Sequence, residues 1–142
     1  MLEKTDLKRF AVEHQRSFER ALFEIRRGRK LSHWMWYIFP QLRGLGMSDT
    51  AIYFGIEDLD EARAFIGDEY LGGNLREISS ALLDIESNNP RAVMGVTDSM
   101  KLRSCMTLFL HATDDNGVFR AVLDKFFGGE EDEATLEILG KG

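Results

Sequence analysis

The sequence predicts an all-α protein, a single compact domain over residues 1–142 with about seven to eight helices around a central buried helix. Apolar residues recur at spacings of three and four almost throughout, which is the period of an amphipathic helix. No stretch shows a run of strict alternation with β-branched residues, and the chain has only two prolines. The length is typical of one domain, and no linker, repeat or low-complexity tract divides the chain.

Residues that start or stop helices separate the expected elements of the first half. Gly28 ends the first helix after two arginines, which the helix dipole favours in a last turn. Ser32 is expected to cap the second helix and Pro40 to end it, and Ser48 is expected to cap the third. The expected helices are 7–27, 33–39, 49–53 and a helix from 58 or 60 to 67.

In the second half, the apolar stripe within 75–85 marks an amphipathic helix that the run 88–90 breaks. Thr97 precedes a helix that is apolar almost all round after Ser104. That second half of the helix is therefore expected at the centre of the bundle. Glycine-containing turns separate the remaining elements. The expected helices are 71–86, 98–112, 118–127 and 134–139.

Composition and charge exclude several classes of protein. Fifteen aromatic residues are too many for a disordered chain, and the single cysteine, Cys105, cannot form an internal disulfide. The net charge is −6, which disfavours general nucleic-acid binding. Residues 1–45 nevertheless carry ten basic and five acidic side chains, against eight and nineteen in the rest. No apolar run is long enough to span a membrane and no apolar leader is present, so a cytoplasmic location is expected.

No metal site or cofactor is expected. The three histidines, His14, His33 and His111, are scattered and have no cysteine or carboxylate at ligand spacing. Ser104 and His111 share a helix face but lie two turns apart, beyond hydrogen-bond reach. Cys105 is most simply a small buried apolar residue.

The segment 33–40 is the densest in aromatic side chains and is the first candidate for a site. It is either buried core or the wall of a pocket for flat rings. His33 and Trp36 share one face of the expected helix. In the pocket interpretation, His33 is a general acid/base or hydrogen-bond donor, and Trp36 and Tyr53 stack on the ligand.

The loop 41–48 is the second candidate. Its two glycines allow close backbone approach, Arg43 can clamp an anion, and Ser48 opens a helix whose first N–H groups attract negative charge. An ordinary turn between helices explains the same residues. The basic turn 26–30 is likewise either solvated surface or a phosphate contact.

The segment 101–109 is the third candidate. Arg103 and Thr107 stand four apart, and an arginine that enters a core needs a carboxylate or an anionic ligand. Ser104 and Thr107 either orient that ligand or bond back to the preceding helical turn. Both interpretations stay open at this point.

The chain resembles the family numbered 1810 among the domains of unknown function. The resemblance rests on 33–41, on Gly44, Leu45, Gly46 and Ser48, on Tyr53, on 71–72, on 101–109 and on the similar segments 124–129, 132 and 135–136. Cys105 stands where a second serine is expected. The resemblance implies a mainly α-helical single domain, usually bacterial and also fungal, and brings no established activity.

The leading functional hypothesis is a pocket that binds, and in one version processes, a small anionic, nucleotide-like metabolite. It requires that the aromatic segment and 101–109 face one cavity. The alternative is a non-enzymatic protein-interaction module, and hydrolase or transferase activity through Ser104 or Cys105 ranks third. His33 and Ser104 are the catalytic candidates. The candidate ligand-binding residues are Trp36, Gln41, Arg43, Ser48, Tyr53, Lys101, Arg103 and Thr107.

Overall fold

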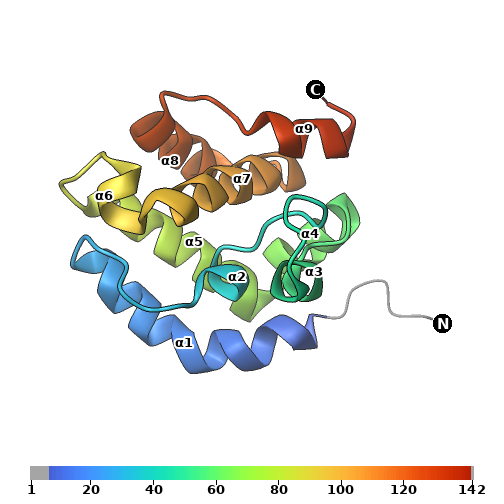
Figure 1. Cartoon of the computed structure of the whole chain (residues 1–142), viewed down its shortest axis with the longest axis horizontal. Coiled ribbons are helices and arrows are strands. Elements are labelled where there is room, and N and C mark those ends of the chain that lie inside the picture. Colours follow the sequence, from blue (N-terminus) through green and yellow to red (C-terminus); the bar gives the residue numbers. More distant parts are fainter. Residues whose placement is uncertain (1–6, 142) are drawn as a thin grey trace.

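The computed structural model describes residues 7–141 and confirms the all-α prediction. Within this range the helices are α1 (Lys8–Arg26), α2 (Met35–Ile38), α3 (Asp49–Phe54), α4 (Leu59–Gly67), α5 (Glu69–Asp84), α6 (Pro90–Met94), α7 (Val96–Ala112), α8 (Gly117–Phe127) and α9 (Glu133–Leu139). Figure 1 shows α1 on one side of the molecule and α7, α8 and α9 on the other, with α5 between them.

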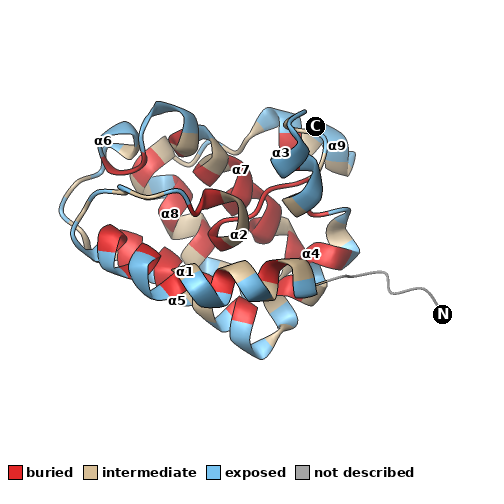
Figure 2. Ribbon diagram, turned by 60° about the horizontal axis from the view of Figure 1, so that its bottom comes forward, coloured by how far each residue is buried: buried red, intermediate tan, exposed pale blue. Residues whose placement is uncertain are grey.

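The apolar helix α7 is the central helix of the bundle. It packs against α4, α6, α8 and α9, while α5 packs against α1, α4 and α8. Leu102, Cys105 and Phe109 are fully buried, and Figure 2 shows the burial running along most of α7. An apolar surface on all sides of a helix is stable only at such a central position.

The structure corrects two predicted boundaries. The run 88–90 starts α6, which we did not predict, whereas the preceding helix, α5, already ends at Asp84. The Asn89 side chain accepts hydrogen bonds from the N–H groups of Arg91 and Ala92, and Pro90 occupies the first turn, where its missing N–H is not needed. Ser32 does not cap α2, which begins at Met35 without a side-chain cap, because the Ser32 hydroxyl donates to Glu24 instead.

A short parallel bridge closes the segment that leads into and out of α3. The N–H of Arg43 donates to the carbonyl of Ile56 at 2.8 Å, and the N–H of Ile56 donates to the carbonyl of Gln41 at 2.9 Å. Gly55 lies so close that an added Cβ would stand 2.7 Å from the Cβ of Arg43. The bridge fixes Gln41 and Leu42 in the core beside α2.

Two buried polar contacts hold α1 against its neighbours. Arg9 donates to both carboxylate oxygens of Glu61, at 2.7 and 3.0 Å. The His14 ring bonds the carbonyl of Tyr37 through Nδ1 and the amide of Asn74 through Nε2, so it joins α1 to α2 and α5. Burial lowers the pKa of His14 against the raising effect of the Tyr37 carbonyl, and this favours the neutral ring. No helix among the described residues is long and apolar enough to cross a membrane.

Candidate functional site

The aromatic segment and α7 meet in one open groove of about 270 Å³. We call it the Trp36 groove and define it by Trp36, Gln41, Gly46, Lys101, Ser104 and Asp132. Trp36 comes from α2, Gln41 and Gly46 from the loop that follows, Lys101 and Ser104 from α7, and Asp132 from the turn before α9. The groove therefore joins parts of the chain that lie nearly a hundred residues apart.

The groove presents an aromatic ring, a cation and the side-chain amide of a largely buried glutamine. The Nζ of Lys101 lies over the Trp36 ring, 4.1 Å from its centroid, in cation–π geometry. Gln41 is only 8% exposed, and its side-chain amide makes no hydrogen bond to any residue in the described range. Because Gln41 lines the groove, its donor and acceptor are open to a ligand.

A smaller hollow of about 90 Å³ adjoins the groove and shares Trp36 and Lys101 with it. We call it the Asp98 hollow and define it by Lys30, His33, Trp34, Asp98 and Lys101 with Trp36. The Nζ atoms of Lys30 and Lys101 lie 2.8 and 3.2 Å from the Asp98 carboxylate. Two ammonium groups thus share one carboxylate, and the Lys30 side chain is only 7% exposed.

This surplus of one positive charge is the main electrostatic feature of the Asp98 hollow. A partly desolvated cation is stabilised by an anion, and the positive charge of Lys30 and Lys101 is offset only in part by Asp98. His33 lines the same hollow and is exposed. The hollow can accept an anionic group the size of a few water molecules.

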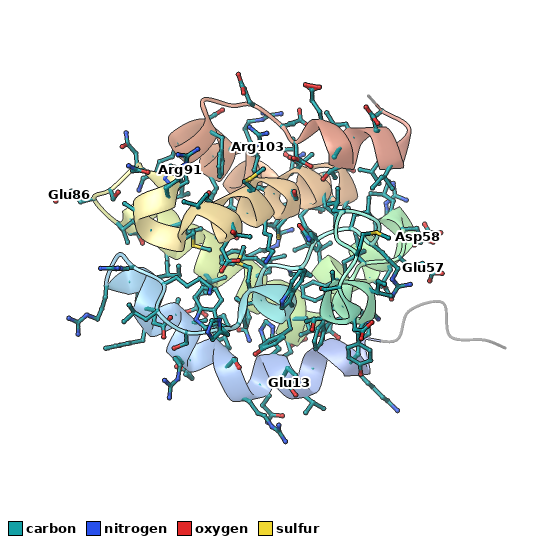
Figure 3. The ribbon with its side chains drawn as sticks, viewed as in Figure 1. Glu13, Glu57, Asp58, Glu86, Arg91 and Arg103 are labelled. Atoms are coloured by element: carbon teal, nitrogen blue, oxygen red, sulfur yellow. The ribbon has the colours of Figure 1, made fainter. Side chains whose placement is uncertain are left out.

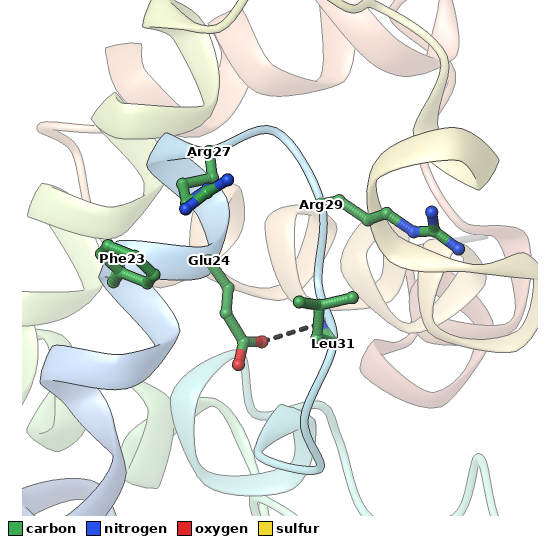
Figure 4. Close-up of a pocket in the computed structure, with 5 residues that line it drawn as sticks. All are labelled: Phe23, Glu24, Arg27, Arg29 and Leu31. Atoms are coloured by element: carbon green, nitrogen blue, oxygen red, sulfur yellow. Dashed lines mark hydrogen bonds between the residues drawn. The ribbon is translucent and has the colours of Figure 1, made fainter.

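Glu24 fixes the loop that carries these residues. Its Oε1 accepts hydrogen bonds from the N–H groups of Leu31 and Ser32 and from Nε1 of Trp34, at 2.8, 2.9 and 2.9 Å. Its Oε2 accepts the Ser32 hydroxyl. The contact with Leu31 is drawn in Figure 4. Burial raises the pKa of Glu24, but the bonds from Ser32, Leu31 and Trp34 outweigh it and bring the pKa to about 2.

The lowered pKa of Glu24 predicts a specific acid sensitivity. The unfolded chain binds more protons than the native one between pH 4.5 and 2, so this contribution is complete above pH 4.5 and is lost as the pH falls toward 2. It amounts to about 3 kcal/mol at neutral pH. We expect urea unfolding, repeated at several pH values, to show that the free energy of unfolding of the wild type falls as the pH is lowered from 4.5 toward 2. The free energy of unfolding of Glu24→Gln should change much less over the same pH range. An equal dependence on pH in both proteins would contradict the assignment.

Three of the sequence-predicted residues lie away from the groove. The Arg43 guanidinium donates to the backbone carbonyls of Ile52 and Gly55, at 2.9 and 3.1 Å. The Ser48 hydroxyl accepts from the N–H of Ala51 and caps α3, as its position in the sequence predicts. Tyr53 is exposed and packs edge-on against Phe54. These residues order the segment around α3 and do not line either hollow.

Arg103 and Thr107 lie on the adjoining face of α7, where they hold the turn before α9. Arg103 extends from α7 toward that turn (Figure 3) and lies 3.8 and 3.9 Å from the carboxylates of Glu130 and Asp132. Thr107 is buried, donates to the Arg103 carbonyl and accepts the N–H of Asp132 at 2.8 Å. The carboxylate partners that the sequence analysis considered for Arg103 are therefore present.

The described residues contain no ready nucleophile and base. Ser104 Oγ donates to the Met100 carbonyl in its own helix, and His33 lines the neighbouring hollow. Burial raises the pKa of the Cys105 thiol well above its usual value, which disfavours the reactive thiolate. His111 is bonded to Glu131 at 2.6 Å. No group of three metal-ligating side chains occurs among residues 7–141.

Sequence reasoning missed Asp98 and Glu24 as parts of this region, and it considered Lys30 only as one residue of the basic turn 26–30. Asp98 stands three residues before Lys101 on one helix, a spacing that indicates an ion pair. Lys30 reaches Asp98 only because its N–H donates to the Val93 carbonyl, which sets the loop beside α6 and α7. That contact has no signal in the local sequence.

Residues 4–139 match the family model described as a protein of unknown function, DUF1810. The chain belongs to the DUF1810 family. A search of the curated proteins finds no match. The DUF1810 chain is similar to the crystal structure of the conserved hypothetical protein Rv1873 from Mycobacterium tuberculosis, with 41% sequence identity and a TM-score of 0.94. That likeness covers 97% of this chain and 99% of the mycobacterial one.

Proposed function

We propose that the Trp36 groove and the Asp98 hollow together bind a small anionic, nucleotide-like metabolite. The observation that carries the proposal is the position of Lys101, which lines both hollows, stacks on Trp36 and shares Asp98 with Lys30. A ring and a surplus positive charge are thereby placed side by side. A ligand with a flat heterocycle and a phosphate or carboxylate matches both features.

Each hollow takes one part of this ligand. The heterocycle packs against Trp36 in the larger groove and hydrogen-bonds the open amide of Gln41. The anionic group enters the smaller hollow, where it balances Lys30 and Lys101, with His33 as a further donor. Ser104 adds a hydroxyl whose oxygen is free to accept a second bond. The proposal is one of binding, because no residue within 7–141 contacts Ser104 or His33 in a way that would activate it as a nucleophile or base.

Intrinsic fluorescence tests the proposal directly, because Trp34 and Trp36 are the two tryptophans of the chain and both line the Asp98 hollow. We expect AMP and other nucleoside monophosphates to change the emission in a saturable way. Lys101→Met should weaken AMP binding about tenfold or more, since it removes a charge-assisted contact, and should leave adenosine binding nearly unchanged. Trp36→Leu should weaken binding of both ligands.

Lys141→Met is the matched control, because Lys141 is exposed at the far end of the chain. It removes the same charge and should bind AMP like the wild type. A panel of purine and pyrimidine monophosphates, sugar phosphates and carboxylates that leaves both the emission and the melting temperature unchanged would refute the proposal. Binding that survives Lys101→Met would place the ligand elsewhere.

A further inference from the structure

A separate surface lies at the C-terminal end of α1. We call it the α1-end surface and define it by Phe23, Arg26, Arg27, Arg29 and Leu31. It contains two hollows of about 440 and 390 Å³ that share Phe23 and Arg27. Figure 4 shows the first of them, with Phe23 on α1, Arg27 directly after the last residue of α1, and Arg29 and Leu31 on the loop that follows. The surface does not include any residue of the Trp36 groove.

Two large apolar side chains are exposed at this surface and are not part of the hydrophobic core. Phe23 is 60% exposed and Leu31 is 73% exposed, on either side of the first hollow. Leu31 is nevertheless held in place, because its N–H is bonded to Glu24. Ordered apolar side chains around a hollow, with charged residues at the rim, are typical of a protein-interaction site.

The surroundings are basic on a chain whose net charge is negative. Residues 19–31 carry five basic and two acidic side chains, while the whole chain has a formal charge of −6. Arg27 lies over the Phe23 ring at 5.5 Å, and neither the Arg27 nor the Arg29 side chain forms an ion pair or hydrogen bond with any described residue. Arg26 has a single exposed contact, with Glu77 at 3.4 Å.

The acidic residues nearby offset this charge only in part, and among the described residues none forms an ion pair with Arg27 or Arg29. Glu24 lines the first hollow, but both of its oxygens are engaged by N–H and O–H donors of the 31–34 loop. Glu19 lines the second hollow only, where it faces Arg26 and Arg27. The guanidinium groups of Arg27 and Arg29 therefore remain open to carboxylates from outside the chain.

We propose that the α1-end surface binds an acidic segment of a partner protein. A large apolar side chain of the partner enters the hollow between Phe23 and Leu31, and neighbouring carboxylates bind Arg27 and Arg29. The hollow of about 440 Å³ favours a partner with a protruding side chain, which a flat membrane surface does not offer. The inference is independent of the proposed metabolite site, because the two surfaces share no lining residue.

A selection from a random peptide display library on the immobilised full chain tests the proposal. The selected peptides are expected to be rich in aspartate and glutamate around one aromatic or large aliphatic residue. Their affinity, measured by fluorescence anisotropy, should fall at least about tenfold with Arg27→Glu/Arg29→Glu and with Phe23→Ala. Because all three positions are exposed, the variants should fold normally, which circular dichroism verifies.

Two matched controls lie on α1 itself. Lys8→Glu/Arg16→Glu makes the same charge change in the first half of the helix, and Val12→Ala shortens an exposed side chain about 16 Å along the axis from Phe23. Both should bind the peptides like the wild type. Selected peptides that are not acidic, or whose binding survives the Arg27 and Arg29 changes, would overturn the proposal.

Two further measurements distinguish the proposed acidic partner from a membrane and from a second copy of the chain. Co-sedimentation with vesicles of phosphatidylcholine and phosphatidylserine that is abolished by Arg27→Glu/Arg29→Glu would assign the surface to a membrane instead. Light scattering that shows a dimer in the wild type and a monomer in the same variant would assign it to a second copy of the chain. We expect no vesicle binding, and a mass that is the same in both proteins.

Discussion

Gly72→Ala is expected to destabilise the protein by about 3 kcal/mol, because the added methyl group meets backbone that has no room to move. Gly72 lies in the first turn of α5, and a Cβ built there would stand 2.1 Å from the carbonyl oxygen and 2.7 Å from the carbonyl carbon of Ile66. Ile66 belongs to α4, which only Asp68 separates from α5. The two helices therefore approach as closely as they do only because residue 72 has no side chain.

The neighbouring glycine provides the control. Gly73 is exposed in the same helix, and an added Cβ would meet nothing within 4 Å. Gly73→Ala should therefore raise the stability by up to about 1 kcal/mol through helix propensity alone. Urea denaturation of both variants should give opposite signs. A Gly72→Ala protein as stable as the wild type would show that α4 and α5 are not in backbone contact at this point.

Glu24→Ala is expected to lower the free energy of unfolding by about 3 kcal/mol. The substitution leaves the N–H groups of Leu31 and Ser32 and the indole N–H of Trp34 without their acceptor, and a buried donor without a partner is costly. The Trp34 emission should move to longer wavelength as water replaces the carboxylate. Urea unfolding followed by tryptophan fluorescence measures both effects in one experiment.

Glu19→Ala is the matched control, since Glu19 is exposed on the same helix. Its effect should lie within about 0.5 kcal/mol of zero. A Glu24→Ala protein with a similarly small loss would mean that the 31–34 loop holds its shape without the carboxylate. The role of Glu24 in positioning Trp34 beside the candidate site would then be lost as well.

The spacing of apolar residues predicted most of this fold, because a helix with one buried face has apolar residues at every third or fourth position. The period could not predict α6, since Asn89 and Pro90 are typical both of a helix start and of a break. It also could not show that the Ser32 hydroxyl would donate to Glu24 instead of capping α2. In each case the outcome depended on a tertiary partner rather than on neighbours in the sequence.

The candidate site was predictable where side chains lie on regular helices or directly after one. Trp36, Gln41, Lys101 and Ser104 line one groove, as the hypothesis of a shared cavity requires. Arg43 turns to carbonyls of its own loop because the bridge between Leu42 and Ile56 sets its direction. Glu24 lies on the buried face of α1 with Ala21 and Ile25, and a carboxylate at such a position indicates an unidentified set of donors.

The central place of α7 has a consequence for biosynthesis. A ribosome makes the chain from its N-terminus, so the apolar faces of α4 and α6 exist before residues 96–112 that cover them. Until that segment has been translated, the nascent chain exposes surfaces that favour association with other chains or with chaperones. Substitutions that slow the docking of α7 should therefore lower the yield of folded protein in cells more than its equilibrium stability suggests.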